Sequence, residues 1–116
     1  ATGDKVLKQF AQLLNDLVND MDVLARWGGE EFVIFSNNTT IQQAHDKCYE
    51  IQQQLKESQF PGIKTLTASY GIASLKANET MSACFQRADQ ALYKAKDEGR
   101  NRICVADVAE ILSSSA

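Results

Sequence analysis

Two adjacent glycines, Gly28 and Gly29, constrain the fold of this chain more than any other feature, because they lie between two short apolar segments. Residues 23–27 and 31–36 have the composition of strands, and a glycine pair adopts the positive φ angles of a tight hairpin turn without steric cost. The sequence therefore predicts a β-hairpin that turns at the two glycines.

Two amphipathic helices flank this hairpin. Apolar residues recur at helical spacing over residues 6–18, and Asp4 falls in the first turn, where a carboxylate complements the helix dipole. After the hairpin, Thr39 and Gln42 form a capping-box pattern, which predicts a second helix that begins near Thr39 and extends through Leu55.

The remaining chain alternates between strand and helix patterns. Residues 65–73 and 101–105 are expected as strands, a third helix runs from Met81 and ends at Gly99, and a weak helix covers 107–112. The resulting order, α-β-β-α-β-α-β, predicts an α/β chain of the α+β sandwich type, with helices flanking a mainly antiparallel central sheet. Such an order usually opens with a strand, so we expect the chain to be truncated at its N-terminus.

The length and composition fit one globular domain. With 116 residues, 44% of them apolar and 23% charged, the chain can bury its own core. We expect the domain at residues 1–106 and a C-terminal tail at 107–116. The net charge of −3 argues against a nucleic-acid binder, and the longest apolar run, residues 32–35, is far too short for direct membrane insertion.

Several conspicuous side chains are explained best by structure alone. The three cysteines are scattered and form no C-x-x-C pair, so we expect buried thiols in a reducing cytosol and neither a disulfide framework nor a zinc site. His45 is expected as an exposed polar residue of a helix, whereas Tyr70, Phe85 and Tyr93 are expected in the core.

The hairpin also carries candidate chemistry. Glu30 and Glu31 follow the glycines directly, and carboxylate oxygens are ligands that Mg²⁺ takes together with waters and a substrate phosphate. Without side chains at the glycines, backbone N–H groups of the turn can approach a phosphate closely. The alternative, for the hairpin taken alone, is a plain Gly-Gly turn with two solvated glutamates.

The order of further motifs resembles the GGDEF family, the diguanylate cyclases. Residues 26–32, RWGGEEF, are similar to the family signature in its GGEEF form, and Gly3-Asp4 is similar to the end of an upstream G-H-x-x-G-D segment. Residues 69–73, SYGIA, resemble the family's S-x-G-(I/V)-A strand. The segment 87–101 resembles its closing block, R-A-D-x-A-(L/V)-Y-x-A-K-x-x-G-R-N. These matches cover nearly the whole chain.

The resemblance implies a fold related to nucleotide polymerase palms and synthesis of cyclic di-GMP from two GTP with release of pyrophosphate. Each protomer of a homodimer would hold one GTP, and the 3′-hydroxyl of each nucleotide would attack the α-phosphate of the other. Mg²⁺, or Mn²⁺, would be the cofactor. As the output module of a bacterial signalling protein, the domain would follow a sensor or receiver domain and lie in the cytoplasm, even if the parent protein is attached to the inner membrane.

The resemblance also implies roles for single residues. Glu30 corresponds to the metal-binding carboxylate, and Glu31 to the neighbouring acid, for which metal binding and activation of the 3′-hydroxyl both stay open. Gly28 and Gly29 would let the phosphates lie against the turn. Asp4 corresponds to the acid that recognises the guanine edge, and its alternative role is that of a helix-dipole partner.

Two basic residues complete the implied site. Lys96 and Arg100 correspond to the pair that reaches the β- and γ-phosphates, and their spacing of four places them on one helix face. The alternative is a solvated helix end that the dipole favours. Arg26, on the strand before the turn, is either functional or paired with a nearby acid.

The chain departs from the family in two places. The family's opening strand and helix, D-x-D-x-F-K-x-x-N-D, are missing together with a second metal-binding aspartate, so we expect the truncated chain to bind Mg²⁺-GTP poorly. Residues 19–22, NDMD, stand where many members carry an R-x-x-D product-inhibition site. Asp22 remains, but Asn19 offers no guanidinium for stacking or bidentate phosphate contact, so inhibition through this site is expected to be weak or lost.

Two functions follow from these observations. The first is a diguanylate cyclase domain, which the retained Glu30, Glu31, Lys96 and Arg100 favour. The alternative is a catalytically inactive GGDEF module that binds GTP or dimerises as a regulatory domain. The missing aspartate and the degenerate inhibitory site favour this second function.

Overall fold

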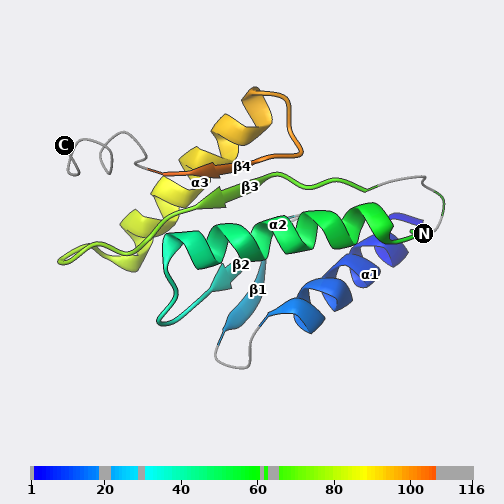
Figure 1. The fold of residues 1–116 in the computed structure, drawn as a ribbon, viewed down its shortest axis with the longest axis horizontal. Helices are drawn as coiled ribbons and strands as arrows, with labels where there is room; N and C mark the ends of the chain where they lie inside the picture. Colours follow the sequence, from blue (N-terminus) through cyan, green and yellow to red (C-terminus); the bar gives the residue numbers. More distant parts are fainter. Residues whose placement is uncertain (1, 19–21, 29–30, 61, 63–65, 107–116) are drawn as a thin grey trace.

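The computed structural model describes residues 2–18, 22–28, 31–60, 62 and 66–106, and its elements follow the predicted α-β-β-α-β-α-β order (Figure 1). The elements are α1 (Thr2–Leu17), β1 (Val23–Gly28), β2 (Glu31–Phe35), α2 (Ile41–Glu57), β3 (Tyr70–Ile72), α3 (Met81–Asp97) and β4 (Ile103–Val105). The α+β class is confirmed. The weak helix expected at 107–112, and the tail that contains it, lie outside the described residues.

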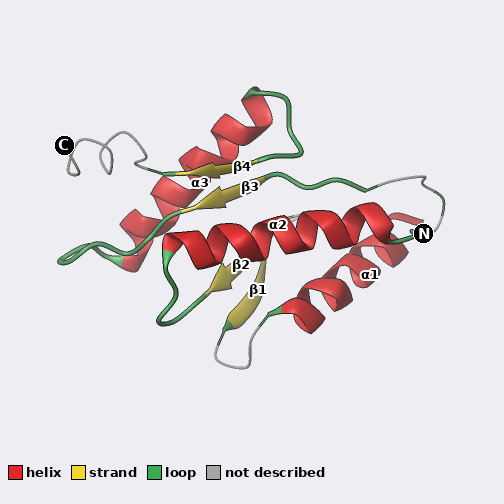
Figure 2. Ribbon diagram, viewed as in Figure 1, coloured by secondary structure: helices red, strands yellow, loops and turns green. Residues whose placement is uncertain are grey.

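The strands among these residues form two separate pairs (Figure 2). The hairpin pair β1–β2 is antiparallel, as predicted, whereas β3 and β4 pair in parallel. The described strands therefore form two small sheets, one antiparallel and one parallel, in place of the single sheet expected. The physical reason for the parallel pair is that α3 connects β3 to β4, and a strand that returns through a crossover helix runs parallel to the first strand.

Gly28 ends β1 at the position where the turn is predicted to begin, and β1 carries an irregularity just before it. Arg26 pairs with Phe32, but Gly28 pairs with Glu31, so β1 has one residue more than β2 over this stretch. An extra residue of this kind is a β-bulge, which increases the local twist and turns the neighbouring side chains. The bulge therefore lies directly beside the acidic residue that begins β2.

The second helix begins one residue later than predicted. The N-cap is Thr40, whose hydroxyl accepts from the backbone N–H of Gln43 at 3.0 Å, while the Gln43 side chain accepts from the Thr40 N–H at 2.9 Å. The Thr39 hydroxyl instead donates to the carbonyl of Asn37 at 2.9 Å, which removes it from capping. Two threonines in succession offer two equivalent capping patterns, and the preceding turn decides between them.

The core lies between α1, α2 and the strands. Ile51 and Leu55 of α2 are each 1% exposed. They belong to one cluster with buried residues of α1, and apolar side chains of the hairpin pack against this cluster together with the side chain of Tyr70. The core assignment of Tyr70 is confirmed, but that of Tyr93 is wrong, because its side chain is 72% exposed. His45 is half-buried, not fully exposed as expected.

The three cysteines are free, as predicted, but each is only half-buried. Desolvation by the surrounding protein nevertheless raises the pKa of the Cys48 thiol to about 11. Burial, and secondarily Cys48, also raise the pKa of Tyr70 well above its ordinary value. The Tyr70 hydroxyl is buried without a hydrogen-bond partner among the described residues.

Gly71 lets α3 lie directly on β3. A Cβ atom at this position would meet the carbonyl oxygen of Ala88 and would lie only 2.5 Å from the backbone nitrogen of Leu92. Real Cβ atoms do not approach backbone so closely, so only glycine fits between the strand and the helix. The distance between β3 and α3 is thereby fixed, and with it the position of the C-terminal end of α3.

No helix of the described residues is long and apolar enough to cross a bilayer.

Candidate functional site

The hairpin supplies one described acidic residue of the expected site. Glu31 begins β2 opposite Gly28, and its side chain is half-exposed. Gly29 and Glu30 lie outside the described residues, so their expected roles stay predictions. A carboxylate at a strand end beside a β-bulge is held on rigid backbone yet remains open to solvent, which suits it to bind a cation or accept a proton.

α1 is fixed against this hairpin by an aromatic pair. The rings of Phe10 and Phe32 stack with their centroids 5.4 Å apart and their planes 6° from parallel. Phe32 follows Glu31 directly, and Phe10 lies in the same helix as Asp4. The pair therefore fixes α1 relative to the start of β2. Asp4 lies in the first turn of α1, although its side chain is not among those described.

The C-terminal end of α3 carries the two expected cations, but not on one helix face. The helix ends at Asp97, so Lys96 lies in its last turn, whereas Arg100 lies beyond the helix with a φ of 63°. The prediction that helical spacing of four aligns the pair is therefore wrong. A left-handed turn, not the helix, sets the direction of the Arg100 side chain.

Neither cation forms an ion pair with a described residue. Lys94 forms an ion pair with Glu98, with 4.0 Å between Nζ and Oε2. Within the described part of the chain, by contrast, no carboxylate lies at ion-pair distance from Lys96 or Arg100. Two unpaired cations at one helix end provide a positive field that suits an anionic ligand such as a phosphate chain.

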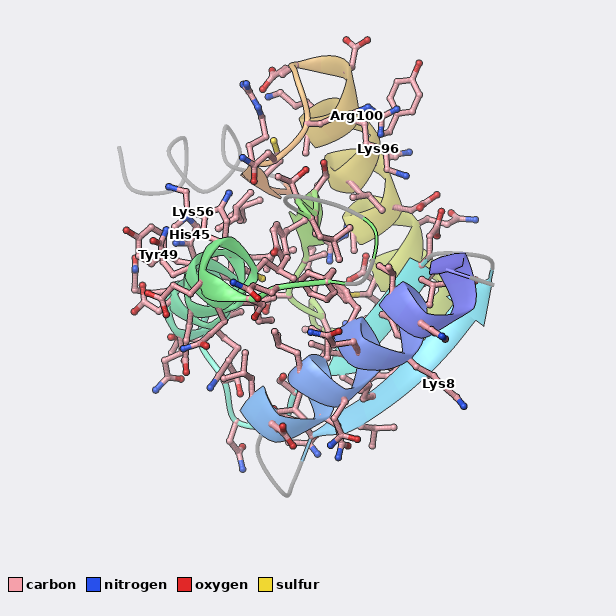
Figure 3. The ribbon with its side chains drawn as sticks, turned by 90° about the vertical axis from the view of Figure 1, so that its right-hand side faces the viewer. Lys8, His45, Tyr49, Lys56, Lys96 and Arg100 are labelled. Carbon is pink, nitrogen blue, oxygen red and sulfur yellow. The ribbon has the colours of Figure 1, made fainter. Side chains whose placement is uncertain are left out.

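The cations and the hairpin lie on the same side of the molecule. Figure 3 shows Lys96 and Arg100 close together at the end of α3, extending on the side away from α2. The β1–β2 hairpin and the start of α1 lie on that side too, whereas His45, Tyr49 and Lys56 of α2 occupy the opposite side. The fold thus brings an acidic strand end and a basic helix end, some 65 residues apart in sequence, to one face (96 − 31 = 65).

An ion pair that the sequence analysis missed fastens the start of α3. Arg87 Nε donates to Glu79 Oε2 at 2.7 Å, and its Nη2 donates to the carbonyl of Ser74 in the loop after β3. The hydrogen bond from Arg87, together with the backbone N–H of Lys76, lowers the pKa of Glu79 to about 2. In the sequence, Arg87 opens the R-A-D block of the closing motif, but neither the motif nor the helical spacing indicates Glu79 as its partner.

The donor chemistry at the hairpin fits Mg²⁺. This ion keeps several waters and takes one or two carboxylates together with substrate phosphates, so it does not require a cage of protein ligands. Glu31 offers one such carboxylate, and the described residues contain no cluster of three or more His, Cys, Asp or Glu that would hold a metal by itself. The phosphates of a bound ligand would complete the coordination of a metal held at this hairpin.

Asp22, expected in a degenerate inhibitory site, lies just before β1 and is half-buried. Asn19 lies outside the described residues. The expected loss of product inhibition thus stays a prediction, and it rests on Asn19 standing where many family members have an arginine.

The comparison with known families matches residues 1–102 to the model described as "Diguanylate cyclase, GGDEF domain". The diguanylate cyclase DgcM of Escherichia coli strain K12 is 36% identical over 104 residues, which are 90% of this chain and 25% of that protein. The chain thus spans about a quarter of the length of this curated relative.

Solved structures show the same likeness. The active GGEEF domain of a diguanylate cyclase from Vibrio cholerae aligns with a TM-score of 0.83 and 36% identity, covering 90% of this chain and 69% of that one. The GGDEF domain of DgcB from Caulobacter crescentus, solved in complex with c-di-GMP, aligns with a TM-score of 0.81 and 29% identity, covering 91% of this chain and 66% of that one. These likenesses confirm the resemblance that the motifs indicated.

Proposed function

The chain belongs to the GGDEF family of diguanylate cyclase domains, and on that premise we propose that it forms cyclic di-GMP from two molecules of GTP. The observation that carries this proposal is that the hairpin, whose strand β2 begins with Glu31, lies on the same face as Lys96 and Arg100, two cations that have no ion pair among the described residues. A nucleoside triphosphate with its divalent cation has the complementary charges, since its phosphates need cationic partners and its metal needs carboxylate oxygens.

The proposed roles follow from charge and position. Lys96 and Arg100 hold the β- and γ-phosphates, and Gly28 with Gly29 lets the phosphates lie against the hairpin turn. Asp4, at the start of α1, accepts hydrogen bonds from the N1–H and the amino group of guanine, which selects guanine over adenine. Glu30 and Glu31 hold Mg²⁺ or Mn²⁺, and the metal supplies charge neutralisation at the phosphates.

The bond changes balance in each of two equivalent steps. The 3′-oxygen of one GTP forms a bond to the α-phosphorus of the other, the bond from that phosphorus to the β-phosphate oxygen breaks, and pyrophosphate leaves. The proton of the attacking hydroxyl passes to a base, for which Glu31 is the described carboxylate nearest the turn. Two such steps need two GTP molecules face to face, so the proposed enzyme is a homodimer in which each protomer holds one GTP.

We place this module in the cytoplasm, where GTP is found, as the output of a signalling protein with an upstream sensor or receiver domain. Support for the longer parent comes from the curated relative, of which this chain spans 25%.

Product analysis tests the proposal. The chain is incubated with GTP and Mg²⁺, and the nucleotides are separated by chromatography, with Glu31→Ala as the test variant. Glu57→Ala, which removes an exposed glutamate at the end of α2, is the matched control. With GTP in large excess, so that the poor Mg²⁺-GTP binding expected from the sequence does not hide turnover, we expect cyclic di-GMP from the wild type and the control but not from Glu31→Ala. GTP binding without any product would contradict the proposal and would favour an inactive GTP-binding module.

A further inference from the structure

The turn after α3 has an unusual backbone. Gly99, Arg100 and Asn101 have φ angles of 126°, 63° and 50°, so three successive residues are left-handed. Glycine adopts such angles freely and asparagine tolerates them, but arginine does not favour them. A backbone of this kind persists only where surrounding contacts hold it.

Contacts from two other elements hold this turn. The Nε2 of Gln52, in the middle of α2, donates to the carbonyl oxygen of Asn101 at 2.9 Å and to its Oδ1 at 3.1 Å. The Oγ of Ser69, just before β3, accepts from the Asn101 N–H at 3.1 Å. Asn101 is therefore tied to Gln52, 49 residues earlier in the chain, and to the residue that directly precedes β3.

The contacts within the turn leave the guanidinium of Arg100 untouched. The N–H of Arg100 donates to the carbonyl of Ala95 at 2.9 Å, and its own carbonyl accepts from Arg102 Nε at 3.2 Å. Both bonds use backbone atoms of Arg100. Its side chain is exposed and has no hydrogen bond within the described residues, so the backbone alone sets where the side chain begins.

We propose that Gln52 is a positioning residue for Arg100: by holding the left-handed turn at Asn101, it fixes the point from which the guanidinium reaches the phosphates of GTP. The inference rests on the proposed function, because it assigns Arg100 to those phosphates. Gln52 itself touches no substrate, since it lies on α2 and its amide is used by Asn101. The cation site at the end of α3 therefore depends on α2, a helix that contributes no residue to it.

The chain offers close controls for this test. Gln54 is exposed on the same helix two residues later, and its side chain makes no hydrogen bond within the described residues. Gln52→Ala removes the tether, whereas Gln52→Glu keeps its length but cannot donate to the Asn101 carbonyl. Gln54→Ala and Gln54→Glu make the same changes of size and charge without touching the turn.

Two readouts on the full chain separate positioning from general stability. Hydrogen exchange at the Arg100 and Asn101 amides reports whether the backbone of the turn stays fixed. Calorimetric titration with GTP and Mg²⁺ reports how tightly the chain binds the phosphates of GTP. For both Gln52 variants we expect faster exchange confined to the turn and a rise in Kd for GTP of about 5-fold to 10-fold, the factor for one or two hydrogen bonds. Both Gln54 variants should match the wild type.

The turnover of the Gln52 variants gives a third readout. Because Arg100 is assigned to binding, KM should rise while kcat at saturating GTP stays close to that of the wild type. Wild-type exchange and wild-type GTP affinity in Gln52→Ala would overturn the positioning role while leaving the proposed function intact. A wild-type chain that binds no GTP would instead overturn the proposed function, and these two failures are distinct.

Discussion

At the scale of single residues, the site depends on which charges are left unpaired. Lys94 and Lys96 lie two residues apart on α3, yet among the described residues only Lys94 has a carboxylate partner, Glu98. Lys56, on the opposite side of the molecule, is also exposed (Figure 3). We therefore expect different consequences when these cations are replaced, although composition alone cannot distinguish them.

Replacing either cation of the site should weaken GTP binding. For Lys96→Ala or Arg100→Ala, we expect Kd for GTP to rise roughly 10-fold or more, the factor for one charge-assisted hydrogen bond. Lys56→Ala removes the same charge from α2 and should leave Kd unchanged. Calorimetric titration of the three variants measures these Kd values. If Lys56→Ala weakened GTP binding equally, the effect would come from the net charge of the chain and not from the position of Lys96 and Arg100.

The residues of the site could be named from the sequence, but their geometry could not. The motif that contains Lys96 and Arg100 identified both cations, and the spacing of four suggested a shared helix face. That geometry is wrong, because the helix ends at Asp97 and Arg100 lies in the left-handed turn that follows. The tether from Gln52 had no sequence signal, since its partner Asn101 is 49 residues away.

At the scale of elements, local patterns predicted which segments form helices and strands, and long-range contacts decided how they associate. The glycine pair fixed the hairpin, and the capping pattern was wrong by one residue only because Thr39 and Thr40 are adjacent. The parallel pairing of β3 with β4 follows from the α3 crossover between them. The hydrophobic periodicity of each strand does not show in which direction its partner runs.

The contact between β3 and α3 predicts a large effect of one methyl group. Gly71→Ala would force a Cβ atom against the backbone of Ala88 and Leu92, so we expect the free energy of unfolding to fall by about 2 kcal/mol or more. Urea denaturation measures this change. Ser74→Ala, at an exposed position after the same strand, is the control and should be nearly neutral. A fully stable Gly71→Ala variant would show that α3 does not lie so close to β3.

The ion pair between Arg87 and Glu79 predicts an acid-dependent contribution to stability. The hydrogen bond from Arg87 lowers the pKa of Glu79 to about 2 in the folded chain, below the ordinary value of 4.5. Its stabilisation is therefore fully present above about pH 4.5 and is lost as the pH falls from there towards 2.

Glu79→Gln should lower stability at pH 7 and flatten the pH dependence of unfolding in this acid window. Urea denaturation at a series of pH values measures both effects. Glu57→Gln, whose carboxylate has no ion pair within the described residues, should retain the wild-type profile. An unchanged profile for Glu79→Gln would contradict the pairing.

At the scale of the whole molecule, the two sides of the fold have different proposed uses. The side with the hairpin, the start of α1 and the end of α3 is assigned to GTP, and α2 on the other side supports it through the core and through Gln52 (Figure 3). A site built from three separate elements requires the complete fold, so it is expected to be lost together with global structure.

Inhibition by the product, cyclic di-GMP, also concerns the whole molecule. Asp22 stands without the arginine that many family members carry three residues earlier, so we expect cyclic di-GMP to bind only weakly at this inhibitory position. Calorimetric titration with cyclic di-GMP measures it, and Asn19→Arg, which restores the R-x-x-D pattern, should tighten binding. Micromolar binding by the unmodified chain would contradict the expectation.

The central claim is that two copies of this chain, each holding one GTP, join the nucleotides to each other. The most direct measurement follows pyrophosphate and cyclic di-GMP together during incubation with GTP and Mg²⁺ over a range of protein concentrations. We expect two pyrophosphates for each cyclic di-GMP, and a rate per protomer that rises with protein concentration as dimers form. No product at any concentration, although GTP binds, would contradict the claim.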